Sequence, residues 1–130
     1  MKHLFTILFF SLFVISANAQ ARIGWTEQEI KNDFSDNTFT SGFANNEVYY
    51  IQTRFIHSDI IYYFNDDNLC YGVVIFPITE LDINYYVQNY NSKYVIISDK
   101  EWKQYFDNGN IMTINLFYEP KSGRTMFVIK

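Results

Sequence analysis

The sequence predicts an α+β fold with two layers, in which an antiparallel sheet carries helices on one of its faces. Two segments begin with strong helix-start signals, and each is followed by four runs rich in β-branched and aromatic residues, separated by turn residues. One helix for every four strands is too few to cover both faces of a sheet. The order of a helix and then four strands occurs twice, which predicts a duplicated unit, although residue identity between the halves is too low to prove duplication.

Each predicted helix begins with a capping box, in which a threonine and an acidic residue three positions later satisfy each other's backbone N–H groups. Thr26 precedes Glu29 in the first box, and Thr79 precedes Asp82 in the second. Apolar residues on both sides of each box can form a hydrophobic staple, which fixes how the chain enters the helix. We therefore expect helices over residues 26–34 and 79–90.

The strands of each half follow from runs of high β propensity between turn residues. In the first half we expect strands at residues 38–43, 48–55, 60–64 and 69–76. In the second half we expect them at residues 94–97, 102–106, 111–118 and 125–129, with a short helix at 98–101 as an alternative to a turn. The two halves, 20–77 and 78–130, are together short enough to form a single domain.

Alternation of side chains along these strands separates a core face of the sheet from an open face. Gln52 and Arg54 share one face, and because both are costly to bury without partners, we expect that face to be open to solvent. In the last hairpin the same alternation pairs Leu116 with Phe127 on the core face and leaves Phe117 on the open face.

The orientation of Trp102 depends on the turn that follows its strand. If Asn108-Gly109 forms a two-residue turn, Trp102 lies on the open face. A glycine bulge at the same place would turn Trp102 inward. Trp102 is a candidate open-face residue on the first of these turns, and the inward orientation stays open as the alternative.

The hairpin between the strands expected at residues 60–64 and 69–76 is predicted to close through a four-residue turn at residues 65–68. This turn places Phe64 opposite Leu69. Continuing the alternation then puts Tyr71 on the core face and Cys70 on the open face.

Cys70 is the only cysteine of the chain, and its surroundings argue against chemistry. Within residues 20–130 the only histidine is His57, which lies about 20 Å along the sheet from Cys70, too far to act as its base. One cysteine and one distant histidine cannot form a zinc site either. An intermolecular disulfide remains an alternative, but we interpret Cys70 as a small apolar residue beside Gly72.

Other patterns that carry chemistry are missing from the sequence. The Asn- and Asp-rich segments 65–68 and 107–110 lack the spacing of a calcium loop and are typical of tight turns. There is no Gly-rich phosphate loop, nucleophile elbow or zinc-protease motif. Residues 20–130 carry nine Lys and Arg against 14 Asp and Glu, a charge of −5 that argues against nucleic acid as a partner. We expect no catalytic residues, no bound metal and no cofactor.

Residues 1–19 are predicted to be a signal peptide. A short basic start is followed by an apolar stretch and by Ala17-Asn18-Ala19, the small-residue pattern that precedes cleavage. The apolar stretch, about a dozen residues, is shorter than the roughly 20 that span a bilayer, so we expect no stable membrane insertion after cleavage. The mature protein is expected in the periplasm or outside the cell.

Together these features predict a small exported binding protein that recognises a protein partner through an aromatic open face. The candidate partner-binding residues are Tyr50, Arg54, Tyr63, Trp102 and Phe117, of the types that anchor protein interfaces. The repeated helix-plus-four-strand plan resembles that of β-lactamase-inhibitor-like exported proteins, which implies action by binding, as an inhibitor or an immunity protein would act. The alternatives are a carrier of a small apolar or sugar ligand and a hydrolase that uses carboxylates.

Overall fold

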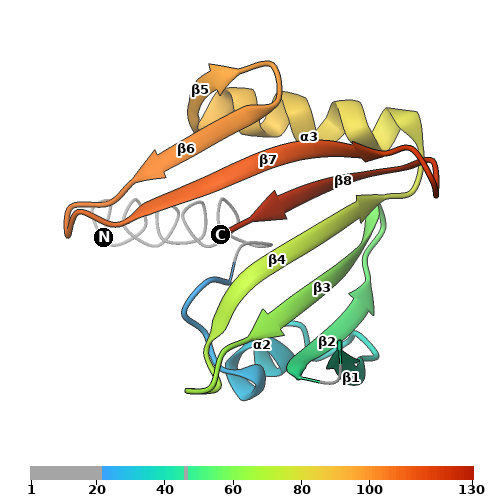
Figure 1. Cartoon of the computed structure of the whole chain (residues 1–130), viewed down its shortest axis with the longest axis vertical. Helices are drawn as coiled ribbons and strands as arrows, with labels where there is room; N and C mark the ends of the chain where they lie inside the picture. The colour runs from blue at the N-terminus through green and yellow to red at the C-terminus, as the bar shows by residue number, and fades with distance from the viewer. Residues whose placement is uncertain (1–21, 46) are drawn as a thin grey trace, which may run out of the picture.

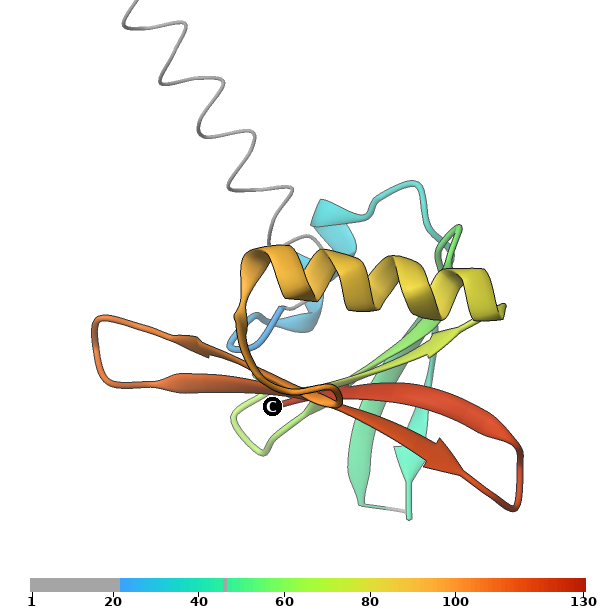
Figure 2. The same cartoon turned by 90° about the horizontal axis from the view of Figure 1, so that it is seen from above.

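Across residues 22–45 and 47–130, which the computed structural model describes, eight strands form one antiparallel sheet and two helices lie on the same face of it (Figure 1, Figure 2). The predicted two-layer α+β fold is confirmed. In chain order the elements are α2 (Glu27–Asp33), β1 (Thr40–Ala44), β2 (Val48–Arg54), β3 (Ser58–Phe64), β4 (Cys70–Pro77), α3 (Glu80–Lys93), β5 (Val95–Ser98), β6 (Glu101–Tyr105), β7 (Ile111–Glu119) and β8 (Arg124–Ile129). The predicted signal peptide, residues 1–19, lies outside the described residues.

The sheet is built from two four-stranded meanders that join through their last strands. The strand order is β1-β2-β3-β4-β8-β7-β6-β5, so each half contributes four consecutive neighbours. The halves meet where β4 pairs with β8, with Val74 opposite Val128. Each meander is preceded by one helix, as predicted, and this repeated order of elements is not by itself proof of a sequence duplication.

Both helices begin at the predicted capping boxes. The Thr26 side chain accepts a hydrogen bond from the Glu29 N–H, and the Thr26 N–H donates to the Glu29 carboxylate, both at 3.2 Å. Thr79 and Asp82 form the same reciprocal pair at 3.2 and 3.1 Å. These bonds satisfy N–H groups that have no partner inside the helix.

No helix in the described part of the chain is long and apolar enough to cross a membrane.

The core fills the space between the helices and one face of the sheet. From α3, Tyr90 packs against Trp102 and Phe127, with ring centroids 5.6 and 5.3 Å apart. Tyr86 shares a buried hydrogen bond of 2.6 Å with the Ser58 hydroxyl of β3. The buried apolar side chains are Ile30, Ile51, Ile60, Tyr62, Phe64, Cys70, Val73, Ile75, Tyr86, Tyr90, Trp102, Met112, Ile114, Phe127 and Ile129.

The predicted pairing is right in the β7–β8 hairpin and wrong in the β3–β4 hairpin. Leu116 lies opposite Phe127, as expected. Phe64, however, lies opposite Cys70 rather than Leu69, because the β3–β4 loop closes with a bond from the Asn65 N–H to the Leu69 carbonyl at 3.0 Å. Cys70 is therefore on the core face and 1% exposed, a correction to its predicted position on the open face.

A bulge in β4 explains why the rest of that strand still faces as expected. The register shifts between Phe64, which pairs with Cys70, and Tyr63, which pairs with Gly72, so Tyr71 is the extra residue. Tyr71 was expected in the core, but its side chain is 46% exposed. Beyond the bulge, Val73 returns to the core face.

Candidate functional site

The face of the sheet that the helices leave uncovered is the candidate site, and we call it the open face (Figure 2). On β2, Ile51 and Thr53 are buried toward the helices, so Tyr50 and Arg54 project to the open face. Tyr63 pairs with Tyr50, and their ring centroids are 6.0 Å apart. Two of the predicted binding residues are therefore direct neighbours on this face.

Tyr50 lies over the glycine of the edge strand. Gly42 is opposite Tyr50, and a Cβ atom added to Gly42 would come within 2.8 Å of the Tyr50 hydroxyl oxygen. The missing side chain of Gly42 is thus replaced by the ring of Tyr50, which leaves that ring half-buried.

Arg54 lies at the far end of β2 and is already paired. Its Nε and Nη2 donate to the two carboxylate oxygens of Asp59 at 2.7 and 2.8 Å. The hydrogen bond from Arg54 lowers the pKa of Asp59 and raises the pKa of the guanidinium itself. Nearby, the guanidinium of Arg124 stacks over the ring of Phe76 at 3.9 Å from its centroid. At this end of the open face Arg54 is paired with Asp59 and Arg124 is stacked on Phe76. These residues border a hollow of about 570 Å³.

Phe117 is on the open face but apart from the tyrosine pair. It lies on β7 opposite Met126 and is 51% exposed. Strands β4 and β8 separate β7 from β3, which carries Tyr63. The structure therefore spreads the predicted anchors across the open face.

Trp102 is on the other face, and the prediction that it lies on the open face is wrong. Its side chain is fully buried and opposite Ile114, and its indole Nε1–H donates to Asn91 Oδ1 at 2.7 Å. The reason is the β6–β7 loop, in which Gly109 has a φ of 89° and the Phe106 N–H bonds the Asn110 carbonyl at 2.9 Å. This glycine-containing three-residue loop shifts the register by one residue and turns Trp102 inward.

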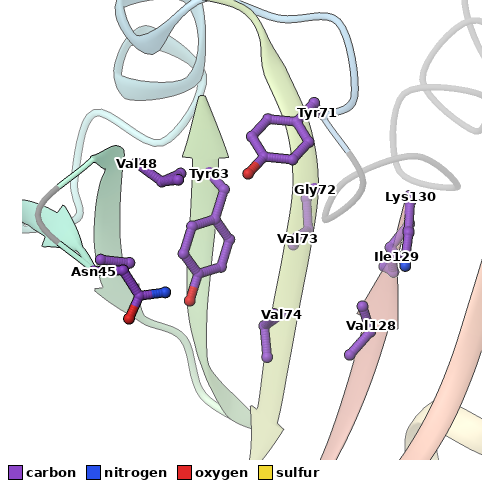
Figure 3. A pocket seen from close by; sticks show the side chains of 11 residues that line it. Asn45, Val48, Tyr63, Tyr71, Gly72, Val73, Val74, Val128, Ile129 and Lys130 are labelled. Carbon is purple, nitrogen blue, oxygen red and sulfur yellow. The ribbon is translucent and has the colours of Figure 1, made fainter. Parts of the chain in front are cut away.

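A hollow of about 410 Å³ opens on the open face between the two halves of the sheet (Figure 3). Tyr63 of β3 and Tyr71 of β4 border it in the close-up, with Gly72 and Val74 of β4 and Val128 of β8 between and beside them. The full lining is Ala44, Asn45, Val48, Tyr63, Tyr71, Gly72, Val73, Val74, Val128, Ile129 and Lys130. Burial raises the pKa of the Tyr63 hydroxyl, which therefore stays protonated as a hydrogen-bond donor.

Sequence reasoning placed Tyr63 on the open face but assigned Tyr71, which also borders the hollow, to the core. Tyr71 was assigned to the core because the alternation was continued from Leu69 without a bulge. Gly72 carried a usable signal, since a glycine inside a strand often marks a bulge or a place where another molecule approaches the backbone.

Cys70 was interpreted as a small apolar residue on the open face, but it lies buried on the core face. Burial raises the pKa of its thiol to about 12, so the reactive thiolate is scarce at neutral pH. The intermolecular disulfide that the sequence left open requires a thiol at the surface, and Cys70 is 1% exposed.

The histidine of the described residues forms a structural pair with a carboxylate of α3. His57 Nδ1 is 2.7 Å from Asp82 Oδ1, and its ring stacks on Tyr85 with centroids 4.3 Å apart. Among the described residues no group of three or more His, Cys, Asp or Glu side chains is placed to hold a metal ion.

Comparisons of the chain with protein-family models, with curated proteins and with solved structures find no match.

Proposed function

We propose that this chain is a small exported, non-catalytic protein that binds a protein partner with the open face of its sheet. The observation that carries the proposal is the placement of both described helices on one face, which leaves aromatic side chains of the other face exposed. Phe117, Tyr71 and Tyr105 are 51%, 46% and 56% exposed. Aromatic side chains such as these are enriched in protein–protein interfaces relative to the rest of the surface.

Two carboxylates of the open face, Asp59 and Glu119, support binding rather than hydrolysis, because both are engaged in structural contacts. Asp59 is held by both arms of Arg54. Glu119 accepts from the backbone N–H groups of Lys121 and Ser122 at 3.1 and 2.7 Å and so closes the β7–β8 turn. A general acid or base must instead be free to exchange a proton with substrate.

The shape of the open face favours a protein partner over a small carried ligand. Carriers surround most of the ligand's surface, whereas the 410 Å³ hollow is open on its solvent side. A partner that covers the surrounding face would bury the exposed aromatics at the same time, with inhibitor-like or immunity-like binding as the result.

Export is part of the proposal and has a direct test. The basic, apolar and small-residue succession of residues 1–19 predicts cleavage after Ala19. Intact mass of the protein recovered from the periplasm or the medium should correspond to a chain that starts at Gln20. A recovered chain that retains Met1 would contradict export by this route.

The binding test compares variants of the immobilised 20–130 chain in capture of proteins from the producing cell's envelope and medium. A partner should be captured by the parent and lost or weakened with Tyr63→Ala or Phe117→Ala, since true anchors contribute about 1 kcal/mol or more. The matched control is Leu81→Ala, which removes an 80% exposed apolar side chain from α3. Equal capture by all four proteins would overturn the proposal.

A further inference from the structure

The glycine at the floor of the hollow, Gly72, is not explained by the folding of the strand. Its φ lies outside the left-handed region, so the backbone there accepts any residue. The bulged residue of β4 is Tyr71, and the bulge therefore does not require glycine at position 72. A Cβ atom at Gly72 would contact nothing within 4 Å except the Ile129 carbonyl oxygen at 3.8 Å.

The space above Gly72 differs from the space above Gly42, the other glycine within a strand. Both glycines lie in strands and face the open side of the sheet. Above Gly42 the space is filled by the ring of Tyr50, whose hydroxyl oxygen would be 2.8 Å from an added Cβ. Above Gly72 the space is the hollow itself. Glycine weakens a strand interior, so an unfilled site above it points to a molecule that fills it on binding.

We infer that the hollow above Gly72 receives one aromatic side chain from a loop of the protein partner, an inference that rests on the proposed function. The floor supplies apolar contact from Val74 and Val128, and the rings of Tyr63 and Tyr71 flank the occupant (Figure 3). Offset or edge contacts between aromatic rings favour an aromatic occupant over an aliphatic one.

The size and rim of the hollow fit the same occupant. A volume of about 410 Å³ is near the lower end for small-molecule sites and has room for a single large side chain. The hydroxyls of Tyr63 and Tyr71 and the amide of Asn45 stand among the lining groups, where they can bond the backbone of the loop that presents the side chain. The hollow leaves the solvent side of its occupant uncovered. Contact between the rest of the partner and the surrounding exposed aromatics would cover that side.

The first test uses p-cresol and indole, which reproduce the side chains of Tyr and Trp, as probes of the ¹⁵N-labelled 20–130 chain. Saturable shifts of the Gly72, Tyr63 and Tyr71 amides at millimolar probe are the expected result. Gly72→Val should abolish these shifts, because its side chain occupies the hollow. Its melting temperature should equal or exceed that of the parent, because valine favours a strand and has free space at this position. Absence of saturable shifts, or shifts confined to another surface, would overturn the inference.

Two further variants keep this test decisive. Ser41→Val places a valine at an exposed position of β1 and should leave the shifts unchanged. Tyr71→Ala removes one wall without adding bulk, and it should weaken probe binding even if Gly72→Val fails to fold. Methyl glucoside and decanoate test the carrier alternative, and saturation of the hollow by either at micromolar concentration would contradict an aromatic protein side chain as the occupant.

Partner capture separates failure of this inference from failure of the proposed function. Gly72→Val should reduce affinity for a captured partner by about tenfold or more, as loss of a central anchor does. If Phe117→Ala loses the partner while Gly72→Val retains it, the hollow is not the anchor and the proposed function stands. If the probes bind at Gly72 but capture does not depend on the open face, the proposed function fails and the inference of a partner side chain fails with it.

Discussion

At the scale of single residues, the bond between Trp102 and Asn91 joins the sheet to the helix layer. Trp102 is fully buried on β6, and its indole N–H has an acceptor in Asn91 Oδ1 on α3 at 2.7 Å. Burying an indole N–H without an acceptor is costly, so this bond allows a tryptophan to fill the core beneath α3.

We predict that Asn91→Ala lowers the free energy of unfolding by about 1–3 kcal/mol, because it leaves the buried N–H of Trp102 unpaired. Asn91→Asp keeps an acceptor oxygen and should cost less. Urea unfolding followed by tryptophan fluorescence measures both variants. Equal stability of Asn91→Ala and the parent would show that water or another group satisfies the indole.

Cys70 gives a second prediction at this scale. Because the thiol is 1% exposed and burial raises its pKa to about 12, the folded protein should react with Ellman's reagent at pH 8 only as fast as it opens. One thiol should react at once in denaturing urea, and Cys70→Ala should give no signal. Rapid reaction of the folded protein would contradict the buried position.

At the scale of elements, the two capping boxes could be predicted because their signals are local. Thr26 and Thr79 each stand three residues before their acidic partner, and both helices begin directly after them. The strands also appear close to their predicted bounds, since runs of β-branched and aromatic residues between turn residues are read directly from the chain.

Two hairpin loops account for the errors in facing. The loop at residues 65–68 was expected to be one residue longer, and the glycine-containing loop at Gly109 was only the alternative to a two-residue turn. Asn68 and Gly109 both adopt positive φ, 61° and 89°, and each ends a three-residue loop where four and two residues were expected. Both register errors have this origin, because a shift of one residue reverses every side chain of a strand. The positive φ of Asn68 has only a weak residue signature, and the one local signal for the bulge at Tyr71 is the glycine that follows it.

The turn between β2 and β3 is tied to α3 by the pair of His57 and Asp82. The hydrogen bond from His57, with the capping contacts of Thr79, lowers the pKa of Asp82 below its ordinary value of 3.8. A carboxyl whose pKa is lower in the folded state stabilises the fold above its unfolded pKa. That contribution is lost as the pH falls through the folded pKa.

We therefore predict that Asp82→Asn destabilises the protein most at pH 5 and that the difference from the parent shrinks below about pH 4. Melting temperatures of both proteins between pH 5 and pH 2 provide the measurement. Glu80→Gln, which removes a carboxylate from the same turn but leaves the capping box, is the control. A difference that stays constant with pH would assign the effect of Asp82 to cap geometry alone.

At the scale of the whole molecule, one face of the sheet packs against the helices and the other is left uncovered. The sequence predicted this division from Gln52 and Arg54, which are too polar to bury unpaired, and it placed Tyr50, Tyr63 and Phe117 correctly on the open face. The hollow could not be predicted, because it forms where β4 of one half pairs with β8 of the other. No local pattern specifies that contact, which joins strands from distant parts of the chain.

Phe127 and Phe117 test this division most directly, because they lie on neighbouring strands but on opposite faces. Phe127 is fully buried beneath α3, whereas Phe117 is 51% exposed on the open face. In urea unfolding, Phe127→Ala should lower the free energy of unfolding by about 3–5 kcal/mol through loss of core packing. Phe117→Ala should change it by less than about 1 kcal/mol, as exposed substitutions do. If Phe117→Ala proves as destabilising as Phe127→Ala, the open face is buried in the isolated protein, and the assignment of that face to partner binding is contradicted.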